Sequence, residues 1–234
     1  MPQHQIVDHD AWLCSRKEFL AKEKEFTRAR DALSEARRAL PWEKVEKNYV
    51  FDGPAGQETL ADLFQGRSQL VVYHFMFGPD ATEGCKACSF WADNFERNVI
   101  HLAHRDVTLV AISRSPIDKL RAFQKRLGWT FKWVSSGRND FNFDFGVSFE
   151  PSRRESTYNY APKSFGGNEL PGVSVFYKDT DGSIYHTYST YGRGLDMMNA
   201  AYNYLDLVPK GRDEKNLSFS MEWLRYRDAY DAGS

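Results

Sequence analysis

The sequence predicts an α/β domain, with a central mixed sheet flanked by helices and a helical arm at its N-terminus. After residue 42, short β-like runs alternate with helical runs, which is typical of a partly parallel sheet. Later, two strand-like runs flank turn residues at 179–182, which predicts an antiparallel hairpin. The length of 234 residues allows one substantial core. We expect an arm at 1–42, a domain at 43–207 and a polar tail at 208–234.

The arm is predicted to be one helix. Residues 12–40 are rich in Lys, Arg, Glu and Ala, and a large apolar residue recurs every seven positions, at Trp12, Phe19, Phe26, Leu33 and Leu40. This spacing places a narrow apolar seam on a helix. Asp10 or Ser15 is suited to cap it, and Pro41 ends it. The seam either docks on the chain's own domain or meets a partner, so a homodimer through this helix is one expectation.

The domain's elements are assigned from local periodicity. We expect strands at 45–51, 69–76, 107–113 and 131–134, and helices at 60–64, 85–104 and 116–127. The run 69–76 is largely apolar, which favours a central strand. Residues 135–170 show no regular period and are expected to form a long loop beside the site. A hairpin of 173–177 with 184–188 and a helix at 195–207 complete the domain.

Composition and charge exclude several classes of protein. The chain has 31 Lys and Arg against 32 Asp and Glu, so no strong field attracts nucleic acid or an anionic membrane. The first residues lack the apolar core of a signal peptide, and the longest apolar run, at 70–77, is too short to span a bilayer. We therefore expect a cytoplasmic protein whose three cysteines stay reduced.

The tetrapeptide Cys85-Lys86-Ala87-Cys88 is the most informative motif. Three randomly placed cysteines would show this spacing in about 3% of chains, so the pair favours redox or metal chemistry. The pair lies where an apolar strand meets a predicted helix, so the Cys85 sulfur faces unpaired N–H groups and the positive end of the helix dipole. Lys86 adds a nearby cation. These features predict an acidic, nucleophilic Cys85 thiol.

Cys85 and Cys88 are therefore the predicted catalytic residues. Cys85 attacks a disulfide, and Cys88, one helical turn further on, resolves the mixed disulfide, leaving an intramolecular disulfide. Such a reaction needs no dissociable cofactor, and its partner is a protein or small-molecule disulfide or thiol. The alternative is that both thiols pack as small apolar groups. Cys14, on the charged arm, is interpreted as incidental.

Histidines offer two further hypotheses. Cys85, Cys88, His101 and His104 approximate a zinc-binding spacing, but one continuous helix would separate Cys88 from His101 by about 20 Å. We therefore expect no metal, and interpret the histidines as residues of a helix C-terminus. His74 is expected to be a hydrogen-bonded core residue, with proton transfer to the thiols as the alternative.

Several stretches together resemble one known family. They are Leu40-Pro41-Trp42, residues 72–77, Gly84-Cys85 with Cys88-Ser89, residues 113–116, Ser189-Thr190-Tyr191 and residues 211–214. The sequence resembles the thioredoxin-like family of unknown function number 899 over nearly its whole length. This resemblance implies a thioredoxin-type fold and a dithiol-disulfide activity, without naming a substrate.

Two wider resemblances suggest supporting residues. Leu170-Pro171-Gly172 leads into a strand as the cis-proline element of thioredoxins does, so Pro171 is the candidate cis-proline. The segment 77–85 is similar to the peroxiredoxin loop that places Pro and Thr before the peroxidatic cysteine, which implicates Thr82. The Pro-to-Cys spacing is one residue shorter here. Glu169 precedes the late strand where peroxiredoxins carry an arginine; Arg114 and Arg153 are possible substitutes, although a salt-bridge role is expected for both.

The sequence therefore predicts a thiol-disulfide oxidoreductase with a thioredoxin-like fold. The alternatives are a peroxiredoxin-like thiol peroxidase, in which Cys85 becomes a sulfenic acid, and a non-catalytic interaction protein. Aromatic residues at 141, 143, 145, 158 and 160 are expected in the core, or else in a wall over the thiols. Residues 152–167 and the polar tail have no predicted role.

Overall fold

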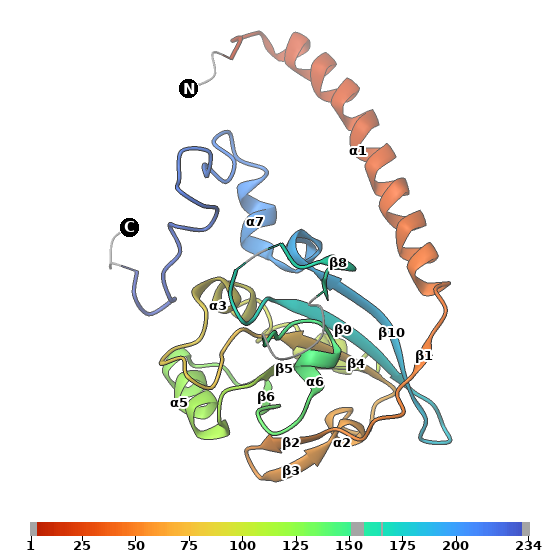
Figure 1. The fold of residues 1–234 in the computed structure, drawn as a ribbon. Helices are drawn as coiled ribbons and strands as arrows, with labels where there is room; N and C mark the ends of the chain where they lie inside the picture. The colour runs from red at the N-terminus through yellow and green to blue at the C-terminus, as the bar shows by residue number, and fades with distance from the viewer. Residues whose placement is uncertain (1–3, 151–156, 165, 231–234) are drawn as a thin grey trace. The chain divides into compact units, whose positions relative to one another are not determined.

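The computed structural model describes residues 4–150, 157–164 and 166–230. The chain divides into two compact units, Met1–Pro41 and Trp42–Ser234. The first holds helix α1 (His9–Arg38) (Figure 1), in which no residue is buried. Its N-cap is Asp8, whose carboxylate accepts a hydrogen bond from Ala11 N–H at 2.8 Å. The predicted helix is confirmed, but the predicted caps Asp10 and Ser15 are wrong because the helix begins earlier.

The second unit is built on an eight-stranded mixed sheet of order β1-β10-β9-β4-β5-β6-β2-β3. Its strands are β1 (Glu43–Lys44), β2 (Val50–Gly53), β3 (Gly56–Thr59), β4 (Gln69–His74), β5 (Val107–Ser113), β6 (Lys132–Ser135), β9 (Gly172–Lys178) and β10 (Ile184–Tyr191). Strands β4, β5 and β6 are parallel, and β9 is antiparallel to both β4 and β10. A separate two-stranded sheet pairs β7 (Thr157–Tyr158) with β8 (Ala161–Pro162).

The helices of the second unit are mostly short. They are α2 (Leu60–Leu63), α3 (Lys86–Ala92), α4 (Val99–Ala103), α5 (Ile117–Leu127), α6 (Phe141–Asp144), the 3-10 helix η1 (Gly192–Met198) and α7 (Ala200–Leu205). Helix α5 ends at Gly128, which has φ +66° and so closes the helix in the left-handed conformation that glycine favours. Within the described residues, no helix has the length and apolar character needed to cross a membrane.

The connection of these elements defines the fold. A β4-α3-α4-β5 unit supplies two parallel strands, and the β9-β10 hairpin followed by α7 supplies two antiparallel ones (Figure 1). The order β10-β9-β4-β5 places the hairpin beside the first parallel strand, which is the arrangement of a thioredoxin-like fold. The predicted fold class is therefore confirmed.

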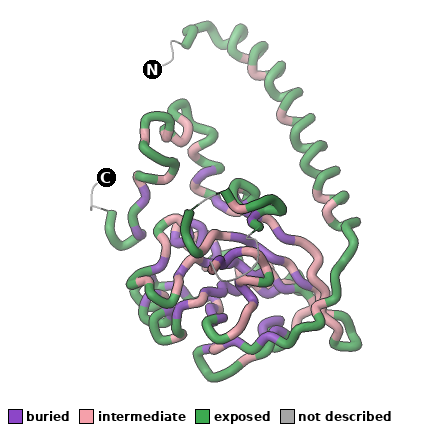
Figure 2. Tube along the Cα trace, in the orientation of Figure 1, coloured by how far each residue is buried: buried purple, intermediate pink, exposed green. Residues whose placement is uncertain are grey.

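The sheet has an apolar core on each face, because successive side chains of a strand point to opposite sides. From β4, Leu70 and Val72 enter one core, whereas Tyr73 enters the other together with Cys88. Figure 2 shows the buried positions concentrated in the strands and the exposed ones along α1. We call the face that holds Cys88 the thiol face.

Four predicted elements differ from the structure. The stretch 135–170, expected as a long loop, holds α6 and the paired strands β7 and β8 within its described residues. The predicted strand 45–51 is two strands, because β1 pairs with β10 whereas β2 pairs with β3 and β6. The predicted helix 85–104 is divided into α3 and α4. Helix α3 ends at the short polar residues Asp93 and Asn94, which are weak helix formers. Their side chains accept hydrogen bonds from Trp129 Nε1 and from Ala200 N–H, respectively. The predicted helix 195–207 is η1 followed by α7.

Candidate functional site

The loop at 77–84 carries the chain from β4 to the first cysteine. Cys85 is the N-cap of α3, with φ −60° and ψ 131°, and its N–H donates to the Met76 carbonyl at 3.0 Å. The Phe77 carbonyl accepts a hydrogen bond from Ser115 N–H at 2.8 Å. These backbone bonds fix both ends of the loop, so the position of Cys85 is set by the sheet.

Gly84 is required for this loop to pack. A Cβ atom at Gly84 would lie 2.8 Å from the Phe75 ring and 2.9 Å from the Phe123 ring, closer than such atoms normally approach. Its carbonyl accepts a hydrogen bond from the buried Tyr226 hydroxyl at 2.7 Å. The C-terminal segment is thereby attached directly beside Cys85.

Cys85 and Cys88 lie together on the thiol face. Both are free, Cys85 is partly exposed, and Cys88 is 1% exposed. The two side chains are 4.0 Å apart, whereas a disulfide needs sulfurs about 2.0 Å apart. The pair is therefore in its reduced form.

The pKa of Cys85 is lowered to about 7. The main cause is the Cys88 thiol, which donates a hydrogen bond to the Cys85 sulfur, and the N–H groups of Cys88 and Ala87 contribute in the same direction. Burial opposes the shift. A thiol with a pKa near 7 is about half thiolate at neutral pH, so the predicted acidity of Cys85 has a physical basis.

Cys88 has the opposite character. Its burial raises its pKa well above the ordinary value, and its hydrogen bond to Cys85 acts in the same direction. The Tyr73 hydroxyl and the Met76 N–H, 3.4 Å from the sulfur, donate to Cys88 and partly offset the increase. Since the Met76 carbonyl also accepts from Cys85 N–H, a single peptide segment holds both cysteines.

This difference predicts selective alkylation of the reduced protein. The rate at which iodoacetamide modifies Cys85 should rise about tenfold between pH 6 and pH 8 and level off above about pH 8, because only the thiolate reacts. Cys88 should react far more slowly throughout. Peptide mapping by mass spectrometry measures both rates, with exposed Cys14 as the internal reference. Equal labelling of Cys85 and Cys88 would contradict the assignment.

Glu169 is a site residue that the sequence did not identify as one. Burial raises the pKa of its carboxyl to about 7; Arg114 lowers it, Cys85 raises it, and the Phe77 N–H donates to it. The carboxyl packs over the backbone of Gly78, and a Cβ there would lie 3.5 Å from its Cδ atom. In the sequence, its only signal is its position just before Leu170-Pro171.

The raised pKa of Glu169 links folding stability to pH. The folded protein holds the carboxyl proton of Glu169 more tightly than the unfolded chain does. The contribution of this proton to folding stability is therefore fully present below about pH 4.5 and is lost as pH rises through about 7. Relative to Glu169→Gln, the wild type should lose about 2–3 kcal/mol of unfolding free energy across this window. Urea denaturation at several pH values measures the difference. Parallel pH profiles for the two proteins would show that the carboxyl is not buried in this way.

The predicted supporting residues lie around the pair, but with different contacts. Lys86 is exposed, and its Nζ lies 5.8 Å from the centroid of the Tyr226 ring. Thr82 is exposed in the bend before Cys85 and makes no hydrogen bond to another described residue. Pro171 lines a cavity that also reaches Cys88. The predicted cis bond at Pro171 is wrong, since the described residues include no cis peptide bond; the β9 strand begins there without it.

His74 is a buried core residue, as expected. Its Nε2 lies 2.8 Å from Ser174 Oγ, and its ring stacks beside Phe145. Burial lowers its pKa to about 3, so it is neutral. His74 follows Tyr73 in β4 and therefore points to the face opposite the thiols. This position gives no support to proton transfer between His74 and the cysteines.

The remaining predicted residues are also placed. Arg114 pairs with Glu150 at 3.1 Å, with its side chain 16% exposed, so its salt bridge is partly buried rather than on the surface. Arg153 lies outside the described residues. His101 is in α4 and His104 caps it, in a different helix from the cysteines. In the described ranges, no three His, Cys, Asp or Glu residues are grouped to hold a metal.

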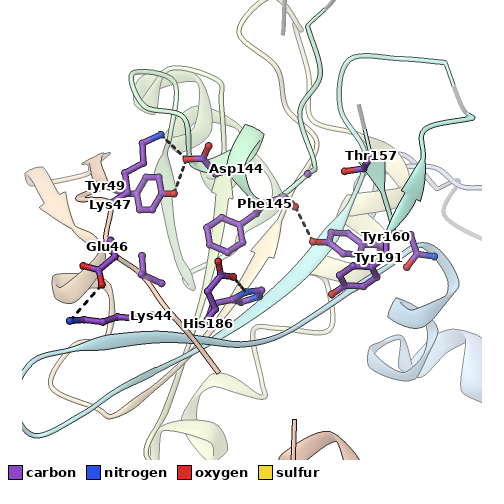
Figure 3. A pocket seen from close by; sticks show the side chains of 14 residues that line it. Lys44, Glu46, Lys47, Tyr49, Asp144, Phe145, Thr157, Tyr160, His186 and Tyr191 are labelled. Atoms are coloured by element: carbon purple, nitrogen blue, oxygen red, sulfur yellow. Dashed lines mark hydrogen bonds and ion pairs between the residues drawn. The ribbon is translucent and has the colours of Figure 1, made fainter. Parts of the chain in front are cut away.

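A second cavity, of about 490 Å³, has no cysteine in its lining. In this cavity Lys47 and Tyr49 are directed at Asp144 (Figure 3). Each donates a hydrogen bond of 2.7 Å to its carboxylate, and a Glu43 carboxylate oxygen lies 3.8 Å from His186 Nδ1. His186 packs against Phe145, in the core opposite the thiol face. This cavity lies on the other face of the sheet, so the thiol chemistry does not use it.

Comparison with known proteins places the chain in a family. A family described as "Bacterial protein of unknown function (DUF899)" matches residues 1–230. The chain belongs to this family. The resemblance noted from the sequence is thereby confirmed for DUF899, and no curated protein matches the chain.

Solved structures similar to this DUF899 protein include peroxiredoxins. The peroxidoxin BcpB from Mycobacterium tuberculosis is 16% identical, with a TM-score of 0.47, over 69% of this chain and 94% of that one. A peroxiredoxin Q mutant from Xanthomonas campestris is 15% identical, with a TM-score of 0.47, over 70% and 98%. The mitochondrial 2-Cys peroxiredoxin from Plasmodium falciparum is 13% identical, with a TM-score of 0.42, over 70% and 92%.

Proposed function

We propose that this DUF899 protein is a cytoplasmic thiol-disulfide oxidoreductase in which Cys85 and Cys88 form the redox pair. The observation that carries the proposal is the pairing of a partly exposed thiol of lowered pKa with a buried thiol 4.0 Å away. A structural pair of cysteines requires no such asymmetry. Perturbed pKa values in adjacent groups favour a functional site.

The reaction begins at Cys85. Its thiolate attacks one sulfur of a disulfide, forms a mixed disulfide, and releases the other half of the substrate as a thiolate. The Cys88 thiol then loses its proton and attacks the Cys85 sulfur, which closes the Cys85–Cys88 disulfide and releases the second thiol. Tyr73 and the Met76 N–H donate to the Cys88 sulfur and would stabilise the thiolate that this step needs.

The other predicted residues have supporting roles in this proposal. Pro171 lines the same cavity as Cys88 and shapes the backbone on the opposite side of it. Lys86 and Thr82 lie on either side of Cys85 in the sequence and are both exposed, so in this proposal they lie on the side from which the substrate approaches. The reaction needs no dissociable cofactor. A cellular thiol system returns the disulfide to the dithiol.

A redox titration tests the proposal. The protein is equilibrated at a series of thiol-disulfide ratios, quenched with an alkylating agent and digested. The masses of its peptides are then measured by mass spectrometry. We expect a reversible two-proton mass loss confined to the peptide that holds Cys85 and Cys88. Failure to form this disulfide under any oxidising condition would contradict the proposal.

The same site could instead belong to a peroxidase. In that reaction hydrogen peroxide oxidises Cys85 to a sulfenic acid, and the Cys88 thiol then condenses with it to form the disulfide and release water. The Glu169 carboxyl near Cys85 does not separate the two reactions, because both begin with the Cys85 thiolate. Rapid peroxide consumption that is lost in Cys85→Ser would favour the peroxidase. Normal cellular function of a Cys85→Ser, Cys88→Ser double variant would instead favour a non-catalytic interaction protein.

A further inference from the structure

A cavity of about 500 Å³ lies next to Cys88. Its lining comes from α3, from the end of β4, from Pro171, from η1 and α7, and from the C-terminal segment at 212–221. We call it the thiol pocket. Cys88 and Ala87 are part of the lining, whereas Cys85 is not; a molecule held in the pocket therefore lies beside Cys88, whose side chain is 4.0 Å from that of Cys85.

The C-terminal segment forms one wall of this pocket, and hydrogen bonds hold it in place. The carboxylate oxygen Oε1 of Glu214 accepts hydrogen bonds from the Tyr202 hydroxyl at 2.9 Å, Met221 N–H at 3.0 Å and Trp223 Nε1 at 2.8 Å. Glu214 therefore joins helix α7 to the segment beyond it. This gives a structural role to residues 211–214, a stretch whose role the sequence did not indicate.

Apart from Glu214, the charged residues that line the pocket form ion pairs with each other. Arg212 binds Asp196 at 2.9 Å and Asp206 at 2.8 Å, and its guanidinium lies 3.9 Å from the centroid of the Tyr202 ring. Arg193 also pairs with Asp196, and its side chain is 88% exposed at the rim. Among the described lining residues, charge is thus largely neutralised within the wall.

The surfaces left to meet a ligand are mainly apolar. They come from Tyr73, Met76, Trp91, Leu195 and Met221. Trp91 Nε1 donates to the Leu195 carbonyl at 2.8 Å, so the polar atom of the indole is already satisfied. Ligand pockets of this volume that are lined by aromatic and aliphatic groups bind apolar parts of small molecules.

We propose that the thiol pocket binds the apolar arm of a low-molecular-mass disulfide, and this inference rests on the proposed function. A disulfide with charged arms would lose hydration inside the pocket, where the charges of Arg212, Asp196 and Asp206 are already paired. An apolar arm is held against Met76 and Leu195, and its disulfide lies at the cysteines. The C-terminal segment therefore sets which substrate the dithiol reduces.

The chemistry balances without another reactant. The substrate R–S–S–R accepts two electrons from the dithiol and leaves as two molecules of R–SH, while Cys85 and Cys88 become a disulfide. The two thiol protons of the cysteines end on the two leaving thiols.

The test uses a residue that lines the pocket but makes no side-chain hydrogen bond. Ser220 is exposed and lines the pocket, so Ser220→Trp should fill it. Ser218 is exposed outside the pocket, and only its backbone N–H is bonded, to Glu222, so Ser218→Trp is the matched control. Each reduced protein is oxidised with dipropyl disulfide, with 2-hydroxyethyl disulfide and with glutathione disulfide under single-turnover conditions.

We expect Ser220→Trp to lower the rate constant for dipropyl disulfide at least about tenfold relative to wild type, with less than about twofold change for the two polar disulfides. Ser218→Trp should match wild type. Comparing each variant with wild type on the same substrate cancels the intrinsic reactivity of the disulfide.

The outcomes separate the two proposals. Equal slowing of all three disulfides, or none, would overturn the pocket assignment while leaving the dithiol reaction intact. If wild type reduces none of the disulfides, the proposed function itself fails.

Discussion

Cys85→Ser should lower the rate of dithiol-disulfide exchange at least about 1,000-fold, because a serine hydroxyl is hardly ionised at neutral pH and cannot form a disulfide. Cys88→Ser should behave differently. Cys85 remains a nucleophile there, so the variant should accumulate a stable mixed disulfide with substrate. Stopped-flow oxidation of the reduced protein gives the rates, and intact-mass spectrometry identifies the trapped adduct.

Cys14→Ser is the matched control for both variants. Cys14 is exposed on α1, so its replacement should leave rate and adduct pattern unchanged. If Cys88→Ser released substrate as fast as wild type, Cys88 would not be the resolving residue. If Cys85→Ser kept its activity while Cys88→Ser lost it, the two roles would be reversed.

Gly84→Ala should destabilise the fold by about 1–3 kcal/mol, because its new methyl would meet the rings of Phe75 and Phe123 within 3 Å. Both rings are buried in the thiol-face core, where close packing leaves little room to relax. The same displacement should move the Gly84 carbonyl away from the Tyr226 hydroxyl and so loosen the C-terminal segment. Chemical denaturation measures the stability, and hydrogen exchange of residues 220–230 measures the loosening.

Gly166→Ala provides the control, since a Cβ at Gly166 would have no heavy atom within 4 Å. Its unfolding free energy should match that of wild type within about 0.5 kcal/mol. Equal stability of Gly84→Ala and Gly166→Ala would mean that the rings beside Gly84 move aside without cost.

Periodic, apolar segments were predictable from the sequence. The strand expected at 107–113 is β5, and the helix expected at 116–127 is α5 at Ile117–Leu127. Strand β3, with the sequence Gly-Gln-Glu-Thr, was not predicted because none of its residues is buried. Its formation depends on pairing with β2, which local patterns do not reveal.

Part of the candidate site was likewise predictable from the sequence, and part was not. The cysteine pair and the lowered pKa of Cys85 follow from local spacing and from the start of a helix. Glu169, Tyr73 and Glu214 could not be assigned from spacing, because they reach the site from distant parts of the chain. A Pro-Gly pair before a strand suggested a cis bond at Pro171, yet most such bonds are trans in folded proteins, as this one is.

The hydrogen bond from Tyr226 to Gly84 joins residues 142 positions apart. During synthesis at about 5–20 residues per second, about 7–28 seconds separate the addition of these two residues. The nascent chain therefore carries the cysteine pair through this interval without the segment that later covers it. Premature oxidation is a hazard of that interval, and ribosome-bound chains stalled before Tyr226 should expose a more readily oxidised pair than the finished protein.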